Sequence, residues 1–567
     1  LGTSLHHSDP DDSEIEDHVS EDDIQSDTDD ENIDDVIDES LNTSTPPENT
    51  VHDHRIVIPP HRVIRGKNRH VWSTSKGNIR GRTCAINIVR CNRGPSRMCR
   101  NICEPLLCFE LFITDQIIQE LVQWTNVEIS KKRTDSMTSA TFVDTNPTEI
   151  KAFIGILTLS AAMKDNHLST VELFDSSFTG SIYAAVMSRD RFDFIVRCLR
   201  MDDKTLRPAR RQQDPFIPVR KVWDLFIAQC KMNYSPGSNV TIDEQLLGFR
   251  DAPFECIYLP NKPNKYGIKI PMMSDSGTNY MINAMPYIGK ATNTNGLPQG
   301  ECYLKELSRP IHGINRNITC DNWFTSIPVS KSLLAGPYKL TIVGTVRLNK
   351  REIPEELKNT RSRPVGTSIF CFDGPLTLLS YKPKPSKMVY MLSSCNESAV
   401  INNCKPEMIM FYNQTKGGVD TFDQMCSSMS CSRKTNRWPM TMFYGILNIA
   451  FVNSYVIYTR NVLSKQEKPL NRREYMKKLS TELYTPWMRS RLEIPTLSRR
   501  LRENIENILP QTNQEASQEA EEEPPAKVRR YCNLCTTKKK RMSKMTCTKC
   551  KKTVCGEHKK NVCNNCL

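Results

Sequence analysis

The feature that most constrains this sequence is a set of aspartates carried by apolar segments. Residues 241–246 predict a buried strand that carries Asp243, and a second apolar run ends at Asp321. A third carboxylate, Asp420, follows a Gly-Gly break at the start of an amphipathic helix that also carries Asp423. Because charged side chains are rarely buried without a partner, we expect these carboxylates to share divalent cations. Such a set suits metal-dependent phosphoryl transfer on nucleic acid.

Each aspartate has an ordinary structural explanation when it is taken alone. An Asp at the end of a strand is common in turns and helix caps. Asp420 and Asp423 lie one helical turn apart, and such a pair can simply favour a helix N-terminus. The role of Asp423 therefore stays open between a second metal ligand and a residue that positions a ligand or a water molecule.

Six motifs in the chain resemble those of the piggyBac transposases. They read TIDEQLLGF, PNKPNKYGIKI, NITCDNWFTSIP, KLTIVGTVR, YNQTKGGVDTFDQM and SRKTNRWPM, and the resemblance extends from about Arg62 to the C-terminus. It implies an RNase H-like domain in which Asp243, Asp321 and Asp420 form a catalytic triad that holds two Mg2+ ions, with Asp423 beside them.

The resemblance also implies a cut-and-paste DNA transposase. Such an enzyme nicks the transposon ends; the freed 3′-OH attacks the other strand to form a hairpin, which is reopened and joined to a TTAA target. The partners would be transposon-end DNA, TTAA target DNA and a second copy of the chain in a homodimer. The alternative is a domesticated, piggyBac-derived protein that binds DNA without transposition activity, although the intact carboxylates argue against it.

The net charge of +13 is distributed unevenly along the chain. Residues 1–50 contain 18 Asp or Glu and no Lys or Arg, so we expect a disordered acidic region over residues 1–60. Its acidic serine clusters, at Ser20 and Ser26, are typical substrates of an acid-directed kinase. The rest of the chain is strongly basic, which favours a nucleic-acid partner over a merely soluble basic surface. Residues 61–100, rich in Arg and Lys, predict an extended arm along DNA phosphates.

Strand and helix signals predict a multidomain α+β fold. Residues 239–347 read as strand, hairpin, strand, helix and strand, which is the order expected of an RNase H-like core. The hairpin pairs residues 269–273 with residues 280–283. We expect the helix over residues 327–334 and the last strand over residues 340–344.

Helical stripes dominate on both sides of this core, so a helical dimerisation and DNA-binding domain is expected in two parts. The predicted boundaries are 101–238 and 430–508 for the helical domain, 239–347 and 407–429 for the catalytic core, 348–406 for a β-rich insertion, 509–525 for a linker and 526–567 for a cysteine-rich domain. The insertion is expected to have a basic face formed by Lys350, Arg351, Arg361, Arg363, Lys382, Lys384 and Lys387.

Basic residues near the core are candidate DNA contacts. They are Arg347, Lys350, Arg433, Lys434, Arg437 and Trp438, the last of which lies within the Arg/Lys cluster. A Trp in such a cluster can stack on an unpaired base or cap a duplex end, but it can equally belong to the protein core.

The last 36 residues carry a metal-binding pattern, with Cys-x2-Cys three times and Cys-x2-His once. Four tight pairs of this kind suit two tetrahedral zinc ions, and no disulfide scheme uses His558. Because the links between the later pairs are short, we expect alternate pairs to share an ion in a cross-brace. One ion would bind Cys532, Cys535, Cys555 and His558, and the other Cys547, Cys550, Cys563 and Cys566. A RING-type ubiquitin ligase is the alternative, but the many lysines of the tail favour DNA.

Location is predicted from three further features. The chain shows no apolar run near the roughly 20 residues that span a bilayer and no N-terminal signal-peptide pattern, so no membrane partner is expected. It begins at Leu1, so an upstream segment stays open. Most other cysteines lie scattered in apolar segments, as in a reducing compartment. Lys527, Arg529 and Arg530 predict an import signal, an import receptor and a nuclear location.

Overall fold

A computed structural model describes most of the chain between residues 63 and 558. The described residues are 63–76, 93–133, 139–250, 257–259, 262, 264–289, 292–358, 363–395, 399–402, 405–509, 530–536, 539–543, 545 and 552–558. The chain divides into two compact units, Leu1–Leu509 and Pro510–Leu567. The predicted acidic region with its kinase sites and nearly all of the predicted linker lie outside the described residues.

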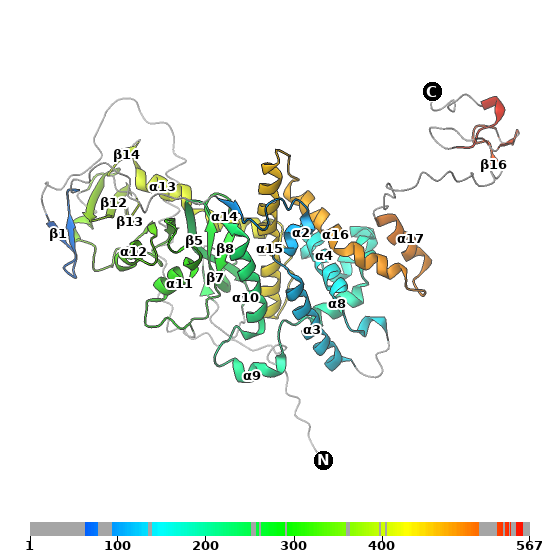
Figure 1. The fold of residues 1–567 in the computed structure, drawn as a ribbon, viewed down its shortest axis with the longest axis horizontal. Coiled ribbons are helices and arrows are strands. Elements are labelled where there is room, and N and C mark those ends of the chain that lie inside the picture. The colour runs from blue at the N-terminus through cyan, green and yellow to red at the C-terminus, as the bar shows by residue number, and fades with distance from the viewer. Residues whose placement is uncertain are drawn as a thin grey trace, which may run out of the picture. The chain divides into compact units, whose positions relative to one another are not determined.

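One mixed sheet, with 11 strands among the described residues, organises the first unit (Figure 1). The part that matches the predicted core consists of β5 (Asn239–Gly248), β7 (Tyr266–Asp275), β8 (Met281–Ala284), β9 (Asn317–Cys320) and β10 (Thr341–Thr345). β7 pairs antiparallel with both β5 and β8, whereas β9 pairs parallel with β5 and β10 pairs parallel with β9. The spatial order is therefore β8-β7-β5-β9-β10. A short strand, β6 (Ile257–Tyr258), also pairs with β7.

The strand and helix predictions for this region hold closely. Met272 and Met273 of β7 pair with Ala284 and Asn283 of β8, as in the predicted hairpin. The predicted helix over residues 327–334 is α12 (Ile327–Leu334), with the same bounds. The predicted strand over residues 340–344 is β10, shifted by one residue.

The β-rich insertion continues the same sheet. Strands β11 (Ser368–Asp373), β12 (Leu376–Lys384) and β13 (Lys387–Ser393) are antiparallel neighbours, and β13 pairs with β10. The expected basic face is wrong for two of its residues, because Arg363 and Lys382 are buried. The Lys382 ammonium donates to the carbonyl oxygen of Arg363 at 2.7 Å, so both cations help to bind the insertion together.

The beginning of the basic segment is a hairpin, so the extended arm predicted over residues 61–100 is wrong there. Strands β1 (Val63–Arg65) and β2 (Val71–Ser73) pair with each other, and β2 pairs with β11. The Trp72 side chain is fully buried, and its indole N–H donates to the carbonyl oxygen of Glu352 at 2.8 Å. Each of these strands has only three residues, with one buried residue between two less buried ones. Because basic residues surround them, the sequence shows no clear strand pattern here.

Helices from the two ends of the first unit pack on each other, since α4 contacts α16 and α2 contacts α15, and together they form one helical body. Its helices are α2 (Pro105–Glu110), α3 (Asp115–Lys132), α4 (Pro147–Met163), α5 (Thr170–Leu173), α6 (Ser176–Thr179), α7 (Ile182–Val186), α8 (Arg189–Cys198), α9 (Arg207–Arg210), α10 (Ile217–Met232), α15 (Trp438–Ser464), α16 (Arg472–Leu492) and α17 (Arg499–Ile508). Three further helices contact strands of the sheet: α11 (Gln299–Leu307), α13 (Glu407–Lys416) and α14 (Gly418–Ser428). α4 packs closely on α16, where a Cβ on Gly155 would lie only 3.1 Å from the Cβ of Leu483.

Helix α15 lies between the sheet and helices α2, α4 and α16, and it contacts both β5 and α2 (Figure 1). It is long and apolar enough to cross a membrane, so the expectation that the chain lacks such a run is wrong. However, 89% of its most apolar window is buried inside the protein. That burial is what the central helix of a folded core requires.

Asn453 fastens α15 to the sheet. Its amide oxygen accepts from the backbone N–H of Met281 at 2.9 Å, and its amide nitrogen donates to the carbonyl of Met281 at 2.8 Å. Asn453 is fully buried, and so is Met281. The side chain therefore satisfies both backbone groups of a residue in β8 that faces away from β7 at this point.

Replacing Asn453 with Leu should leave both backbone groups of Met281 buried without partners. We expect Asn453→Leu to lower the free energy of unfolding by about 2–4 kcal/mol, measured by urea denaturation. Asn507→Leu, at an exposed position of α17, is the matched control and should change it by no more than about 0.5 kcal/mol. Equal effects of the two substitutions would contradict this role of Asn453.

Candidate active site and metal centre

Strand pairing places Asp243 beside Asp321. Ile242 of β5 and Cys320 of β9 are partners in the parallel ladder, so the next residue along each strand is an aspartate. Neighbouring strands lie about 4.8 Å apart, which makes the two residues neighbours where the pairing ends. Each carboxylate also accepts a local backbone hydrogen bond, Asp243 from Glu244 N–H at 2.8 Å and Asp321 from Trp323 N–H at 3.0 Å.

Helices α13 and α14 bring the other two aspartates to this strand. Thr241, Asp243 and Gln245 alternate along β5 and so share one face of it. The Thr241 hydroxyl donates to the carbonyl oxygen of Thr415 at 2.6 Å, and the Gln245 amide donates to Asp423 at 2.7 Å. α14 therefore runs along the face of β5 that carries Asp243.

The start of α14 requires glycine because it lies directly against β5. A Cβ added to Gly418 would lie 2.4 Å from the hydroxyl oxygen of Thr241, closer than real Cβ atoms come. The preceding Gly417 has no such constraint, since its Cβ would meet the hydroxyl oxygen of Thr421 at an ordinary 3.7 Å.

The grouped carboxylates disfavour one another's charge. Burial, then the charge of Glu244 and after it those of Asp420 and Asp321 raise the pKa of Asp243 well above its ordinary value, although Lys262 opposes this. Burial also raises the pKa of Asp423, against the hydrogen bond from Gln245. A bound cation would relieve this repulsion, so the hard oxygen donors and their uncompensated charge fit a divalent metal.

Sequence reasoning missed one cation in this site, Lys262. Its ammonium lies 3.1 Å from a carboxylate oxygen of Asp420 and 3.3 Å from the carbonyl oxygen of Glu244. Burial alone would lower the pKa of Lys262, but the charges of Asp243, Asp420 and Glu244 raise it above its ordinary value. The signal was present in the motif PNKPNKYGIKI, where Lys262 follows the short strand β6.

The carboxylates of the first unit do not form a compact group of metal ligands in this structure. Among the described residues, Cys532, Cys535, Cys555 and His558 are the only group of three or more His, Cys, Asp or Glu whose ligand atoms all lie within 4.8 Å of one another. No three described carboxylates of the first unit therefore meet this limit, and the Lys262 ammonium lies beside Asp420.

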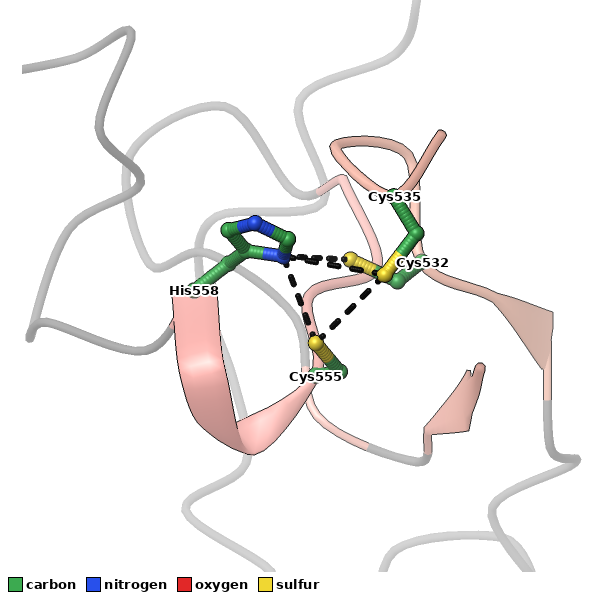
Figure 2. Close-up of side chains that lie close together, drawn as sticks. All are labelled: Cys532, Cys535, Cys555 and His558. Carbon is green, nitrogen blue, oxygen red and sulfur yellow. Dashed lines mark hydrogen bonds between the residues drawn. The ribbon is translucent and has the colours of Figure 1, made fainter. Parts of the chain in front are cut away.

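The side chains of Cys532, Cys535, Cys555 and His558 point toward one another (Figure 2). The Nδ1 atom of His558 lies 3.5 Å from the Cys532 sulfur, 3.7 Å from the Cys535 sulfur and 3.3 Å from the Cys555 sulfur. The sulfurs of Cys535 and Cys555 are 3.7 Å apart. Zinc–sulfur bonds of about 2.3 Å in a tetrahedron require ligands roughly 3.7 Å apart, so the residues fit zinc.

Around this cluster the second unit contains β16 (Arg530–Tyr531), paired with β17 (Met542–Ser543), and a short 3-10 turn over Gly556–His558. The second predicted ligand set, Cys547, Cys550, Cys563 and Cys566, lies outside the described residues, as do Lys527 and Arg529 of the predicted import signal. Arg530 is described through the backbone of β16.

Trp438 belongs to the core, so its predicted stacking on a DNA base is wrong for this structure. Its side chain is 5% exposed and its ring centroid lies 5.8 Å from that of Phe216. The Arg437 guanidinium donates to the carbonyl oxygens of Val196 and Leu199, at 2.9 and 2.7 Å. It therefore caps the end of α8.

The other candidate DNA contacts differ in exposure. Arg433 is partly buried and donates to the carbonyl oxygen of Leu168 at 2.7 Å. Lys434 is exposed and Lys350 is partly exposed. Arg347 donates to the side chain of Asn322 at 2.9 Å, and Asn322 directly follows Asp321 in the sequence. Arg347, Lys350 and Lys434 are thus the predicted contacts best placed to meet a substrate.

Comparison with known proteins shows one family model, one solved structure and two human proteins to which this chain is similar. The family model described as Transposase IS4 matches residues 104–455. A solved piggyBac transposase, a cryo-EM structure of its synaptic complex with hairpin DNA, is 64% identical with a TM-score of 0.73; the match covers 84% of this chain and 100% of that chain.

Two human proteins are more distant relatives, each 23% identical over 398 residues, which is 66% of this chain. They are PiggyBac transposable element-derived protein 3 and the chimeric ERCC6-PGBD3 protein. The chain spans 64% of the length of the first and 36% of the second.

A methyl group at Gly418 should push α14 away from β5. We expect Gly418→Ala to lower the free energy of unfolding by about 1–3 kcal/mol in urea denaturation. Gly417→Ala is the matched control: its φ of −74° suits alanine, so its effect should stay within about 0.5 kcal/mol. If Gly418→Ala is as stable as the wild type, the helix does not depend on this close approach.

Proposed function

Because the chain belongs to the piggyBac family of DNA transposases, we propose that it moves a DNA element by cut-and-paste transposition. The observation that carries this proposal is 64% identity over the full length of a solved piggyBac transposase. That relative was captured as a synaptic complex with hairpin DNA, which supports transposon-end DNA as a partner and a hairpin as an intermediate. Joining to TTAA targets and a homodimeric assembly are proposed from the family resemblance.

The catalytic core is proposed to be RNase H-like. The order β8-β7-β5-β9-β10, with two parallel pairings beside an antiparallel hairpin, supports this assignment. Asp243, Asp321 and Asp420 would hold two Mg2+ ions. When bound, these ions would activate the attacking water or 3′-OH and stabilise the leaving oxygen.

The protein's own residues prepare this site. Strand pairing sets Asp243 against Asp321. The Thr241–Thr415 hydrogen bond holds the end of α13 on β5, directly before α14, the helix that carries Asp420. Gln245 holds Asp423 in place. Asp423 is therefore proposed to be a positioning residue beside the metal ligands, since one of its oxygens is already engaged with the protein.

The cysteine-rich tail is proposed to bind two zinc ions. The mutual distances of Cys532, Cys535, Cys555 and His558 support one of them. The second ion, at Cys547, Cys550, Cys563 and Cys566, is proposed from the spacing alone. A module this small has little apolar core, so metal binding would supply much of its folding free energy.

The remaining assignments are proposals from sequence. The protein is proposed to enter the nucleus through a signal at Lys527, Arg529 and Arg530 that an import receptor reads. Arg347, Lys350 and Lys434 are proposed to contact DNA phosphates, and the acidic region to be a substrate of an acid-directed kinase.

The substitution Asp321→Ala tests the catalytic assignment. We expect Mg2+-dependent nicking of a supercoiled plasmid that carries the element's ends to fall to background, because one lost ligand removes the metals. DNA affinity and thermal stability should stay near those of the wild type, since the basic surface is intact. Asp190→Ala, at an exposed site on α8, is the control and should nick normally. Nicking that persists in Asp321→Ala would refute the assignment, and a wild type that binds but never nicks would favour the domesticated alternative.

Metal analysis tests the zinc proposal. Purified wild-type protein should contain two zinc ions per chain, and Cys555→Ser should lose about one, because three ligands hold zinc poorly. Cys302→Ser, which removes a partly exposed thiol outside the cluster, should keep both. Unchanged zinc content in Cys555→Ser would contradict the proposed ligand set.

A further inference from the structure

Lys262 differs from the other lysine near the carboxylates. Lys269 lies 3.7 Å from a carboxylate oxygen of Glu244, and its ammonium lies 4.4 Å from the centre of the Trp323 ring. Glu244 thus has a cationic partner of its own on β7. The charge of Lys262 is directed instead at Asp420, through the 3.1 Å contact.

The ion pair between Lys262 and Asp420 balances the charge of the carboxylates and contributes little to the stability of the fold. The Asp420 side chain is 61% exposed, and an ion pair with a partner so exposed adds little to stability. The Lys262 side chain is only 23% exposed and gives up hydration to lie there. What the ammonium gains is proximity to several carboxylates at once, since Asp243 and Glu244 also stabilise its charge.

A divalent ion and this ammonium cannot share Asp420 comfortably. A Mg2+ ion bonds a carboxylate oxygen at about 2.1 Å. With Lys262 bound to the same carboxylate, the two cations would stand within roughly 5 Å of each other, where their repulsion is strong in a partly buried site. Binding one therefore favours release of the other.

We propose that Lys262 is a built-in counterion of the catalytic carboxylates, which occupies Asp420 in the metal-free protein and is displaced when a divalent cation binds. This proposal rests on the proposed function, because it takes Asp420 to be a metal ligand. Lys262 is then a positioning residue that lowers the metal affinity of the free protein. When a metal ion binds, the Lys262 ammonium leaves Asp420 and can contact the phosphates of DNA that enters the site.

The test is the affinity of full-length, DNA-free protein for Mn2+, measured by isothermal titration calorimetry. Lys262→Met keeps the length of the side chain and removes its charge, so Mn2+ should bind roughly tenfold more tightly than to wild type. Lys262→Arg restores a cation and should bind Mn2+ like the wild type. Thermal melting of each variant confirms that it is folded.

Lys265→Met is the matched control. Lys265 lies three residues away and is exposed, and its backbone carbonyl accepts from Leu259 N–H at 2.8 Å. The same loss of net charge at this site should leave the Mn2+ affinity unchanged, because an exposed charge is screened by solvent and salt.

The outcomes separate the inference from the function on which it rests. Tighter Mn2+ binding in Lys262→Met alone supports the counterion. Equal or weaker binding in Lys262→Met, with normal binding in the wild type, overturns this inference and leaves the metal site standing. If the wild type shows no saturable Mn2+ binding that Asp321→Ala abolishes, the metal assignment fails and the counterion fails with it.

Discussion

The repulsion between carboxylates on adjacent strands is the constraint on which the rest of this structure depends. β5 and β9 cannot pair in their register without placing Asp243 next to Asp321. Helix α14 adds two more aspartates, Asp420 and Asp423, which increases the electrostatic repulsion at this site. Several contacts offset the repulsion between these carboxylates. Backbone N–H groups donate to Asp243 and Asp321, Gln245 donates to Asp423, and Lys262 lies against Asp420. A site arranged in this way favours the binding of a divalent cation, because the single ammonium of Lys262 does not neutralise four aspartates.

Much of the catalytic part of the fold could be predicted from the sequence because its signals are local. Strand alternation and turn residues located the β7–β8 hairpin, and the apolar pattern of α12 gave its bounds. The aspartates were found for the same reason, since each ends or follows a strong apolar segment. Which of them meet in space depends on pairing between β5 and β9, and here the resemblance to known transposases supplied what periodicity could not.

The predictions that failed concern residues whose environment is set by contacts with distant parts of the chain. Trp72 and Trp438 lie among basic residues, and the sequence gives no sign of the distant surfaces that bury them. Trp72 is covered through contact with Glu352, and Trp438 through contact with Phe216. Arg363 and Lys382 looked like a basic face for the same reason, although each finds its partners inside the insertion. Lys262 was overlooked because its carboxylate neighbours come from other segments, β5 and α14.

The split helical body has a consequence for how the chain is made. α4 is buried along almost its whole length, and the helix that covers it, α16, comes near the end of the first unit. Arg473 of α16 donates to the carbonyl oxygen of Ala162 across 311 residues. At ribosomal speeds of about 5–20 residues per second, that distance takes roughly 15–60 s to synthesise. Throughout that interval the apolar surface of α4 that packs on α16 has no partner, so it stays open to aggregation until translation passes α16.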